Sequence, residues 1–152
     1  VSRGLGDVYK RQIKKHYYAL VEGDTKLEKQ GEIIAPIARD VDSIITRRVH
    51  KSGKYAHTSY RLVGDYGRVK LVDINLHTGR THQIRVHFAH LGLPLLGDDL
   101  YGGSLDYGIK RQALHCHRLA FIDPFTQKEM VHASSLTDDF ETVIMNLQTK
   151  KD

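Results

Sequence analysis

The sequence contains a single cysteine, Cys116, which excludes an internal disulfide framework. One unpaired cysteine is typical of a reducing compartment, so we expect a cytoplasmic protein. No apolar run approaches the ~20 residues of a membrane span, and the longest, residues 33–38, is interrupted by Pro36. Residues 1–12 lack the apolar stretch of a signal peptide. No repeat and no Pro/Gly/Ser-rich linker divides the 152 residues, which favours one domain with no membrane partner.

What the sequence does contain is a modest excess of positive charge. Its 23 Lys and Arg against 18 Asp and Glu give a net charge of +5. This excess is compatible with a polyanionic partner but does not identify one. The 40% hydrophobic and 27% charged fractions are those of a globular domain. Ten histidines are an unusually large number, which makes metal ligation a class to be weighed.

Several short stretches have the alternation or composition of strands. The predicted strands cover residues 17–21, 32–38, 58–63, 68–76, 114–122 and 131–133. The third and fourth are expected to pair as a hairpin around the turn 64–67. In the fourth strand, Asp73 and Asn75 should lie on the sheet face opposite its apolar residues. The basic stretch 47–57 is predicted to be a loop.

Two segments have helical periodicity. The first covers residues 81–91, with Thr81 as the expected N-cap and Gly92 as the expected left-handed residue at its end. Its apolar face consists of Ile84, Phe88 and Leu91. The second covers residues 137–148 and begins with acidic residues, as the helix dipole favours. These elements together predict an α+β domain with a mainly antiparallel, mixed sheet flanked by helices.

Arg85 falls at the border of the apolar face of the first helix and is expected to be half-buried. A guanidinium there needs an anionic partner, because an unpaired buried charge is costly. The planar guanidinium suits a carboxylate or a phosphate equally. An ordinary structural salt bridge remains an alternative to a functional role. The turn 79–81 adds free backbone N–H groups at the start of the helix, which favour an anion.

The histidine spacings argue against a metal site. His82 and His87 are five residues apart and so lie on different faces of a helix, and no glutamate follows the zinc-protease pattern. Cys116 has no nucleophile motif around it. Asp98 and Asp99 would suit a cation or an acid–base pair, or simply a turn. We expect no metal, and a histidine-rich metal hydrolase is the alternative from another class.

The densest motif reads HTGRTHQIRVH over residues 77–87, and HLGLPLLGD follows it over 90–98. KHYYALVEG over 15–23 and GKYAHTSY over 53–60 extend the pattern. This order of motifs resembles the RNA pseudouridine synthases of the RluA type, which act on ribosomal or transfer RNA. The resemblance covers about residues 14–140. It implies that residues 14–148 are part of a pseudouridine synthase catalytic domain.

The resemblance implies isomerisation of uridine to pseudouridine in RNA, with no metal or organic cofactor. In this family an aspartate acts on the bond between ribose and uracil, and the base is turned and rejoined through carbon. By motif, Tyr17 stacks on the uracil and is a candidate acceptor of its C5 proton. Arg85 pairs with the aspartate, and Ile84 packs against the base. A flat aromatic face and an apolar wall suit a detached base.

The same motif implies further contacts with the RNA. The motif residues expected to bind substrate are Arg80, Thr81, His82 and Gln83. The expected phosphate contacts are Arg47, Arg48, Lys51, Lys54 and Arg80. Solvated surface charge remains the alternative for the first four of these cations. The full-length protein is expected to be a monomer.

One part of the family pattern has no match in the sequence. The catalytic aspartate of the family lies in a His-Arg-Leu-Asp-x-x-Thr-Ser-Gly motif, upstream of the tyrosine strand. Residues 1–13 do not resemble it, and we interpret them as foreign or disordered sequence. We therefore expect an N-terminally truncated catalytic domain that is inactive by itself. The alternative is an inactive RNA-binding module with the same fold.

Overall fold

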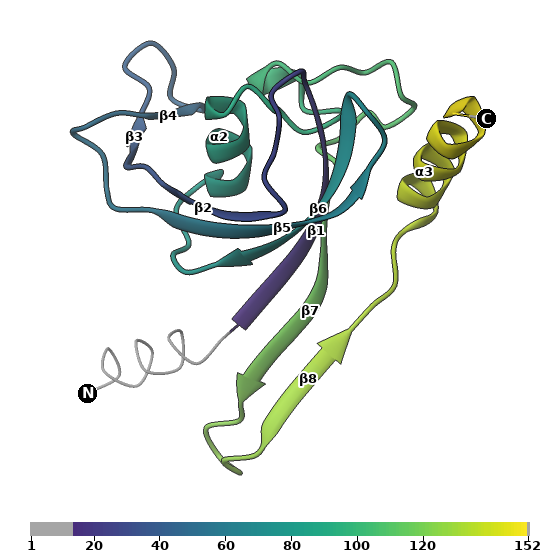
Figure 1. Ribbon diagram of the computed structural model, residues 1–152. Coiled ribbons are helices and arrows are strands. Elements are labelled where there is room, and N and C mark those ends of the chain that lie inside the picture. Colours follow the sequence, from purple (N-terminus) through teal and green to yellow (C-terminus); the bar gives the residue numbers. More distant parts are fainter. Residues whose placement is uncertain (1–13, 152) are drawn as a thin grey trace.

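The computed structural model describes residues 14–151, which form a six-stranded sheet, a separate two-stranded sheet and helices (Figure 1). The strands are β1 (Lys14–Glu22), β2 (Gln30–Ile34), β3 (Ile37–Arg39), β4 (Arg47–Val49), β5 (His57–Asp65), β6 (Val69–Leu76), β7 (Leu114–Ile122) and β8 (Glu129–Ala133). The helices are α2 (Gln83–His90), α3 (Asp138–Lys151) and the short 3₁₀ helix η1 (Asp99–Tyr101). The expectation of foreign or disordered sequence at residues 1–13 lies outside the described residues.

The large sheet has the strand order β2-β5-β6-β1-β7-β8, and β3 pairs with β4 in a separate two-stranded sheet. The expected α+β class with a mainly antiparallel sheet is confirmed, because all the described strand pairings are antiparallel. The sheet is not mixed, since no parallel pair occurs within residues 14–151. The predicted hairpin is present, with Tyr60 of β5 opposite Ile74 of β6. β1 is an interior strand, because β6 pairs with one of its edges and β7 with the other.

The two faces of the sheet pack against different helices, because neighbouring residues of a strand point to opposite sides. On one face lies the α2-side core, which includes Ala19, Val21, Ile33, Val72, Ile74, Ile84 and Phe88. On the other lies the α3-side core, which includes Leu20, Val69, Leu71, Phe140 and Val143. The predicted apolar face of α2 is confirmed by the buried positions of Ile84 and Phe88. Figure 1 shows α2 and α3 at separate ends of the sheet.

Three local predictions were wrong. The stretch 47–57 is not entirely loop, because β4 pairs through its backbone with β3. The extended segment 32–38 is divided into β2 and β3, because Ala35 and Pro36 belong to neither strand. The N-cap of α2 is His82 rather than Thr81, with a left-handed backbone at φ 56° and no side-chain capping bond. Gly92 has the expected left-handed conformation, at φ 78°.

The segment after α2 returns to the centre of the sheet. Leu96 N–H donates to the carbonyl of Leu20 at 2.9 Å, and Ala113 N–H donates to that of Leu96 at 2.8 Å. Gly97 lies so close to the 109–111 segment that an added Cβ would be 2.0 Å from the carbonyl oxygen of Arg111. This close approach fixes the path of the residue that follows, Asp98. Within residues 14–151, no helix has the length and apolar character needed to cross a membrane.

Candidate active site and basic groove

A buried polar network holds the start of α2 against the sheet, and Gln83 is its centre. The Gln83 amide nitrogen donates to the carbonyl of His57 at 3.0 Å and to the hydroxyl of Thr58 at 2.9 Å. The Gln83 amide oxygen accepts from the Thr78 hydroxyl and from Arg80 N–H at 2.7 and 3.0 Å. All four amide bonds are therefore made within the protein, and Gln83 is only 3% exposed. In this structure the Gln83 side chain therefore holds the start of α2 against β5 and does not point into solvent.

His87 continues this network into the core. Its ring nitrogens lie 2.8 Å from the Thr58 hydroxyl and 2.9 Å from the carbonyl oxygen of Ala35. The carbonyl can only accept, so Nε2 carries the proton and Nδ1 accepts from Thr58. Burial lowers the pKa of His87 below the ordinary value of 6.5. The neutral ring is therefore the form that holds α2 on the sheet.

Arg85 finds the anionic partner that its position demands. Its Nε and Nη2 atoms lie 2.9 Å from the two carboxylate oxygens of Asp98, and the side chains are 14% and 1% exposed. The bond to Asp98 raises the pKa of Arg85. The partner in this structure is thus a carboxylate of the same chain, as in the salt-bridge alternative, and not the family's catalytic aspartate. Asp98 was considered for a cation or an acid–base role, and here it is an ion-pair partner.

Tyr101 links Arg85 of α2 to His82, the N-cap of that helix, and to β4. The Arg85 guanidinium lies over the Tyr101 ring, 5.0 Å from its centre. The Tyr101 hydroxyl accepts from Arg47 N–H at 2.9 Å and lies 2.7 Å from Nδ1 of His82. Burial, followed by the charges of Arg85 and Arg47, lowers the pKa of His82. The lowered pKa favours the neutral imidazole, and the ring is held by its hydrogen bond with the Tyr101 hydroxyl.

Tyr17 and Ile84, predicted to contact the base, contact the same apolar cluster. Ile84 belongs to the α2-side core and is 4% exposed, and Tyr17 packs against that core from β1. Burial raises the pKa of Tyr17, followed by the effect of Cys116. The phenol is therefore protonated at neutral pH. The structure brings these two residues to one face of the sheet, and Arg85 follows Ile84 directly on α2.

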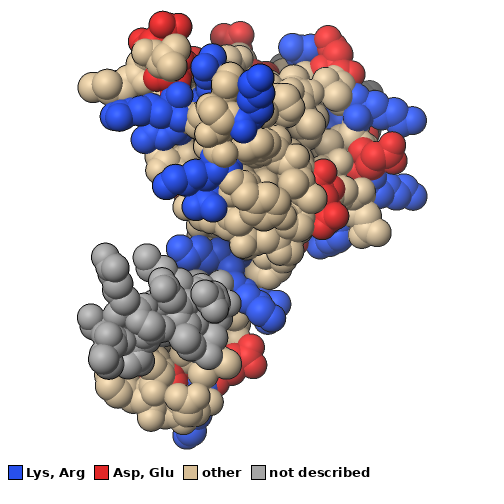
Figure 2. All heavy atoms as spheres, turned by 90° about the vertical axis from the view of Figure 1, so that its left-hand side faces the viewer, with Lys and Arg blue, Asp and Glu red and all other residues tan. Residues whose placement is uncertain are grey.

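Of the predicted phosphate contacts, some line a common groove and the others lie on the surface outside it. A groove of about 600 Å³ between the β3–β4 sheet and the turn before α2 is lined by Arg39, Arg47, Lys54, Arg80 and Thr81, among others. Arg48 and Lys51 are exposed and do not line it. Figure 2 faces the side that carries β3 and β4, and Lys and Arg side chains gather over its upper part. Four cations along one groove form a surface suited to a polyanion.

Some residues of this site were missed from the sequence. Arg39 was not predicted to line the groove, although it belongs to the same basic region as Arg47. Tyr101 was not predicted as a partner of Arg85 and His82. The signal for Asp98 was present, because Arg85 required an acid and Asp98 follows it within the same motif. The histidines weighed for metal, His82 and His87, are each held by protein partners instead.

The chain matches the family model of RNA pseudouridylate synthases over residues 2–90. This range is more than half of the 152 residues and includes β1 to α2. The chain belongs to this family. The Tyr17 strand and the segment with Ile84 and Arg85 both lie inside the matched range, which supports the RluA-type resemblance of the motifs.

Individual RNA pseudouridine synthases agree with the family match. The chain is 43% identical over 132 residues to "Uncharacterized RNA pseudouridine synthase YjbO" of Bacillus subtilis (strain 168), covering 87% of this chain and 46% of that protein. It is 37% identical over 154 residues to "Ribosomal large subunit pseudouridine synthase D" of Buchnera aphidicola, covering 91% and 48%. The chain thus spans less than half the length of these relatives.

A solved structure of a human family member supports the fold. "Human RNA Pseudouridylate Synthase Domain Containing 4" superimposes with a TM-score of 0.72 at 20% identity, covering 97% of this chain and 67% of the other. At that identity the similarity concerns the fold alone. The sheet and helices described above are therefore those of a pseudouridylate synthase domain.

Proposed function

We propose that the protein containing these 152 residues isomerises uridine to pseudouridine within RNA. The observation that carries the proposal is the placement of Tyr17 and Ile84 against one apolar cluster, with Arg85 next on α2. A uracil detached from its ribose must be held while it turns. An aromatic ring and an aliphatic wall can hold it without fixing its orientation.

Arg85 retains the capacity to serve a second carboxylate. A guanidinium has five N–H donors, and the two-point contact with Asp98 occupies one on Nε and one on Nη2. Three donors remain for the family's catalytic aspartate. A neighbouring guanidinium favours the ionised form of that aspartate, as its attack on the ribose–uracil linkage requires. The ion pair with Asp98 then orients Arg85 and does not compete with its role.

The groove supports the choice of RNA as the partner. Arg39, Arg47, Lys54 and Arg80 line it together, and each can contact a backbone phosphate. Arg80 is held in place because its Nε donates to the carbonyl of Tyr55 at 2.8 Å. We include ribosomal or transfer RNA as the substrate, a cytoplasmic location and a monomeric full-length protein in the proposal. The relative named for the ribosomal large subunit favours ribosomal RNA over transfer RNA as the substrate.

Tritium release tests the proposal, because uridine labelled at C5 loses that hydrogen when C5 becomes bonded to ribose. We would assay the 152-residue chain and a joined protein, in which the N-terminal part of the Bacillus subtilis relative precedes Lys14. The substrate would be ribosomal and transfer RNA transcripts. We expect release by the joined protein and none by its Arg85→Ala variant.

Three outcomes would contradict this account. A joined protein that folds and binds the transcripts without releasing tritium would favour the inactive RNA-binding module. Full activity in the Arg85→Ala variant would reject the role of Arg85. Release by the 152-residue chain alone would overturn the expectation that it lacks a catalytic aspartate.

A further inference from the structure

Three potential metal ligands lie on the sheet face opposite Tyr17. Glu32, His57 and His77 come from β2, from β5 and from the residue after β6, which are adjacent in the sheet. Thr58 pairs with Leu76, which places His57 directly opposite His77. Glu32 pairs with Ser59, two residues along the same face from His57. The pleat therefore directs all three side chains to one side.

The donor atoms of these three residues are already close together. Oε1 of Glu32 lies 2.9 Å from Nε2 of His57. The rings of His57 and His77 are stacked, with centres 4.1 Å apart and planes at 20°. One ligand atom from each residue lies within 4.8 Å of those of the other two. Small side-chain rotations would bring these atoms to bonding distance from a common ion.

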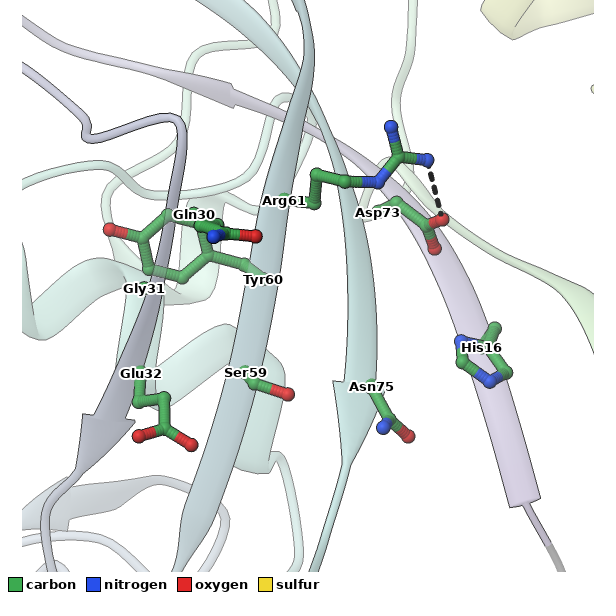
Figure 3. Close-up of a pocket in the computed structure, with 9 residues that line it drawn as sticks. All are labelled: His16, Gln30, Gly31, Glu32, Ser59, Tyr60, Arg61, Asp73 and Asn75. Atoms are coloured by element: carbon green, nitrogen blue, oxygen red, sulfur yellow. Dashed lines mark hydrogen bonds and ion pairs between the residues drawn. The ribbon is translucent and has the colours of Figure 1, made fainter.

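The surroundings allow an ion to enter and favour its retention. The Glu32 side chain is 59% exposed and that of His57 is 17% exposed. An ion can therefore reach the site from solvent at Glu32, whereas His57 is largely shielded by the protein. The Ser59 hydroxyl lies 2.8 Å from Nε2 of His77 and can hold that ring. Figure 3 shows Glu32, Ser59 and Asn75 side by side on this face, with α2 behind the sheet.

We propose that Glu32, His57 and His77 form a binding site for a divalent transition-metal ion such as Zn²⁺. Two imidazoles and one carboxylate are an established zinc ligand set, with a fourth position left for water. Nitrogen ligands select Zn²⁺, Cu²⁺ or Ni²⁺ over Mg²⁺ and Ca²⁺, which prefer oxygen alone. The proposed ligands are distinct from the residues proposed for uracil binding, because Tyr17 lies on the other face of the sheet and Arg85 lies on α2.

Metal binding would also stabilise the support of α2. The backbone of His57 belongs to the polar network described above, because its N–H donates to Thr78 and its carbonyl accepts from Gln83. An ion bridging β2, β5 and the end of β6 would hold this part of the sheet together. Because the unfolded chain does not preform the site, Zn²⁺ should raise the melting temperature.

Calorimetric titration of the 152-residue chain with Zn²⁺ tests the site. We expect one tight ion per chain and no comparable binding of Mg²⁺. His57→Ala and His77→Ala should each weaken binding at least about tenfold, a loss seen even for residues that only support ligands. His132→Ala, at an exposed position on β8, is the matched control and should bind as the wild type does.

Two further measurements keep the result interpretable if a variant is unstable. Glu32→Gln keeps a hydrogen-bonding group beside His57 and removes only the anionic ligand, so it should fold and bind Zn²⁺ more weakly. Bound Co²⁺ should give the intense visible absorption of a four-coordinate site in the wild type, and this absorption should be lost in His77→Ala. Absence of Zn²⁺ binding, or equal binding by the wild type, His57→Ala and His77→Ala, would overturn the proposal.

Discussion

The guanidinium of Arg85 and the carboxylate of Asp98 form a two-point ion pair, with both N···O distances at 2.9 Å. The Asp98 side chain is 1% exposed, so the pair is shielded from water on the acidic side. The stacked Tyr101 ring completes the enclosure of the guanidinium. This geometry fixes Arg85 at the position where the proposed reaction requires a cation.

Removing the acid should destabilise the fold strongly. Asp98→Ala leaves the Arg85 charge without its buried partner, and the free energy of unfolding should fall by about 3–5 kcal/mol. Urea unfolding of the two proteins would measure the difference. Asp99→Ala is the matched control, because Asp99 is the neighbouring and exposed acid. Equal unfolding free energies for the two variants would show that the ion pair contributes little.

Gly97 should tolerate substitution far less well than another left-handed glycine. Gly97 and Gly67 have φ values of 75° and 91°, but an added Cβ at Gly67 meets nothing within 4 Å. Gly67→Ala should therefore cost only the backbone strain, about 1–3 kcal/mol. Gly97→Ala adds an overlap with the Arg111 carbonyl, 2.0 Å away, and should cost several kcal/mol more or prevent folding. Thermal unfolding of both variants would test this, and similar losses would contradict it.

The buried imidazole of His87 should make stability depend on pH. Burial lowers its pKa in the folded state, so the unfolded chain takes up the proton first as the pH falls. Stability is therefore fully present above the ordinary value of 6.5 and is lost below it, by up to about 1.4 kcal/mol per pH unit. Urea unfolding at pH 7.5 and 5.5 would measure this loss.

A variant without the buried imidazole supplies the control for that experiment. His87→Gln should be less stable at pH 7.5 but should lose less stability on acidification than the wild type. His90→Gln, at an exposed position one turn away, should keep the pH dependence of the wild type. An equal loss of unfolding free energy between pH 7.5 and pH 5.5 in all three proteins would mean that His87 does not cause the pH dependence.

The basic groove predicts how RNA affinity depends on salt. Each cation that contacts a phosphate releases counterions, so Lys54→Gln should weaken RNA binding and reduce the slope of log K against log salt by about 1. Lys110→Gln removes an equal charge at an exposed position away from the groove and should leave the slope unchanged. Filter binding from low to moderate salt would measure both. Identical slopes would indicate solvated surface charge at Lys54.

The strongest sequence patterns predicted the elements that build the site. Alternation in residues 68–76 placed Ile74 and Asp73 on opposite faces of the sheet, and the structure confirms this placement. The spacing of Ile84 and Phe88 predicted the buried side of α2. These features depend on local periodicity, which a single segment of sequence contains in full.

The features that the sequence could not predict depend on contacts between distant segments. β4 lacks alternation and exists because its backbone pairs with β3 and Arg47 N–H binds the Tyr101 hydroxyl. His82, whose backbone is left-handed, contacts the same hydroxyl through its ring, and Tyr101 is 19 residues away along the chain. The need of Arg85 for an anion was evident, but its identity as Asp98 depended on the loop path that Gly97 fixes.

The central claim is that this chain supplies the uracil-binding face of a pseudouridine synthase, and Tyr17 tests it most directly. Its neighbour Tyr18 is a matched control on the opposite face of the sheet. There the Tyr18 ring stacks on the His117 ring, with ring centres 3.7 Å apart. The measurement is the rate of tritium release from 5-labelled uridine in RNA by the joined protein and its variants. Tyr17→Leu should abolish release while Tyr18→Leu retains it. Wild-type release by a folded Tyr17→Leu protein would contradict the account.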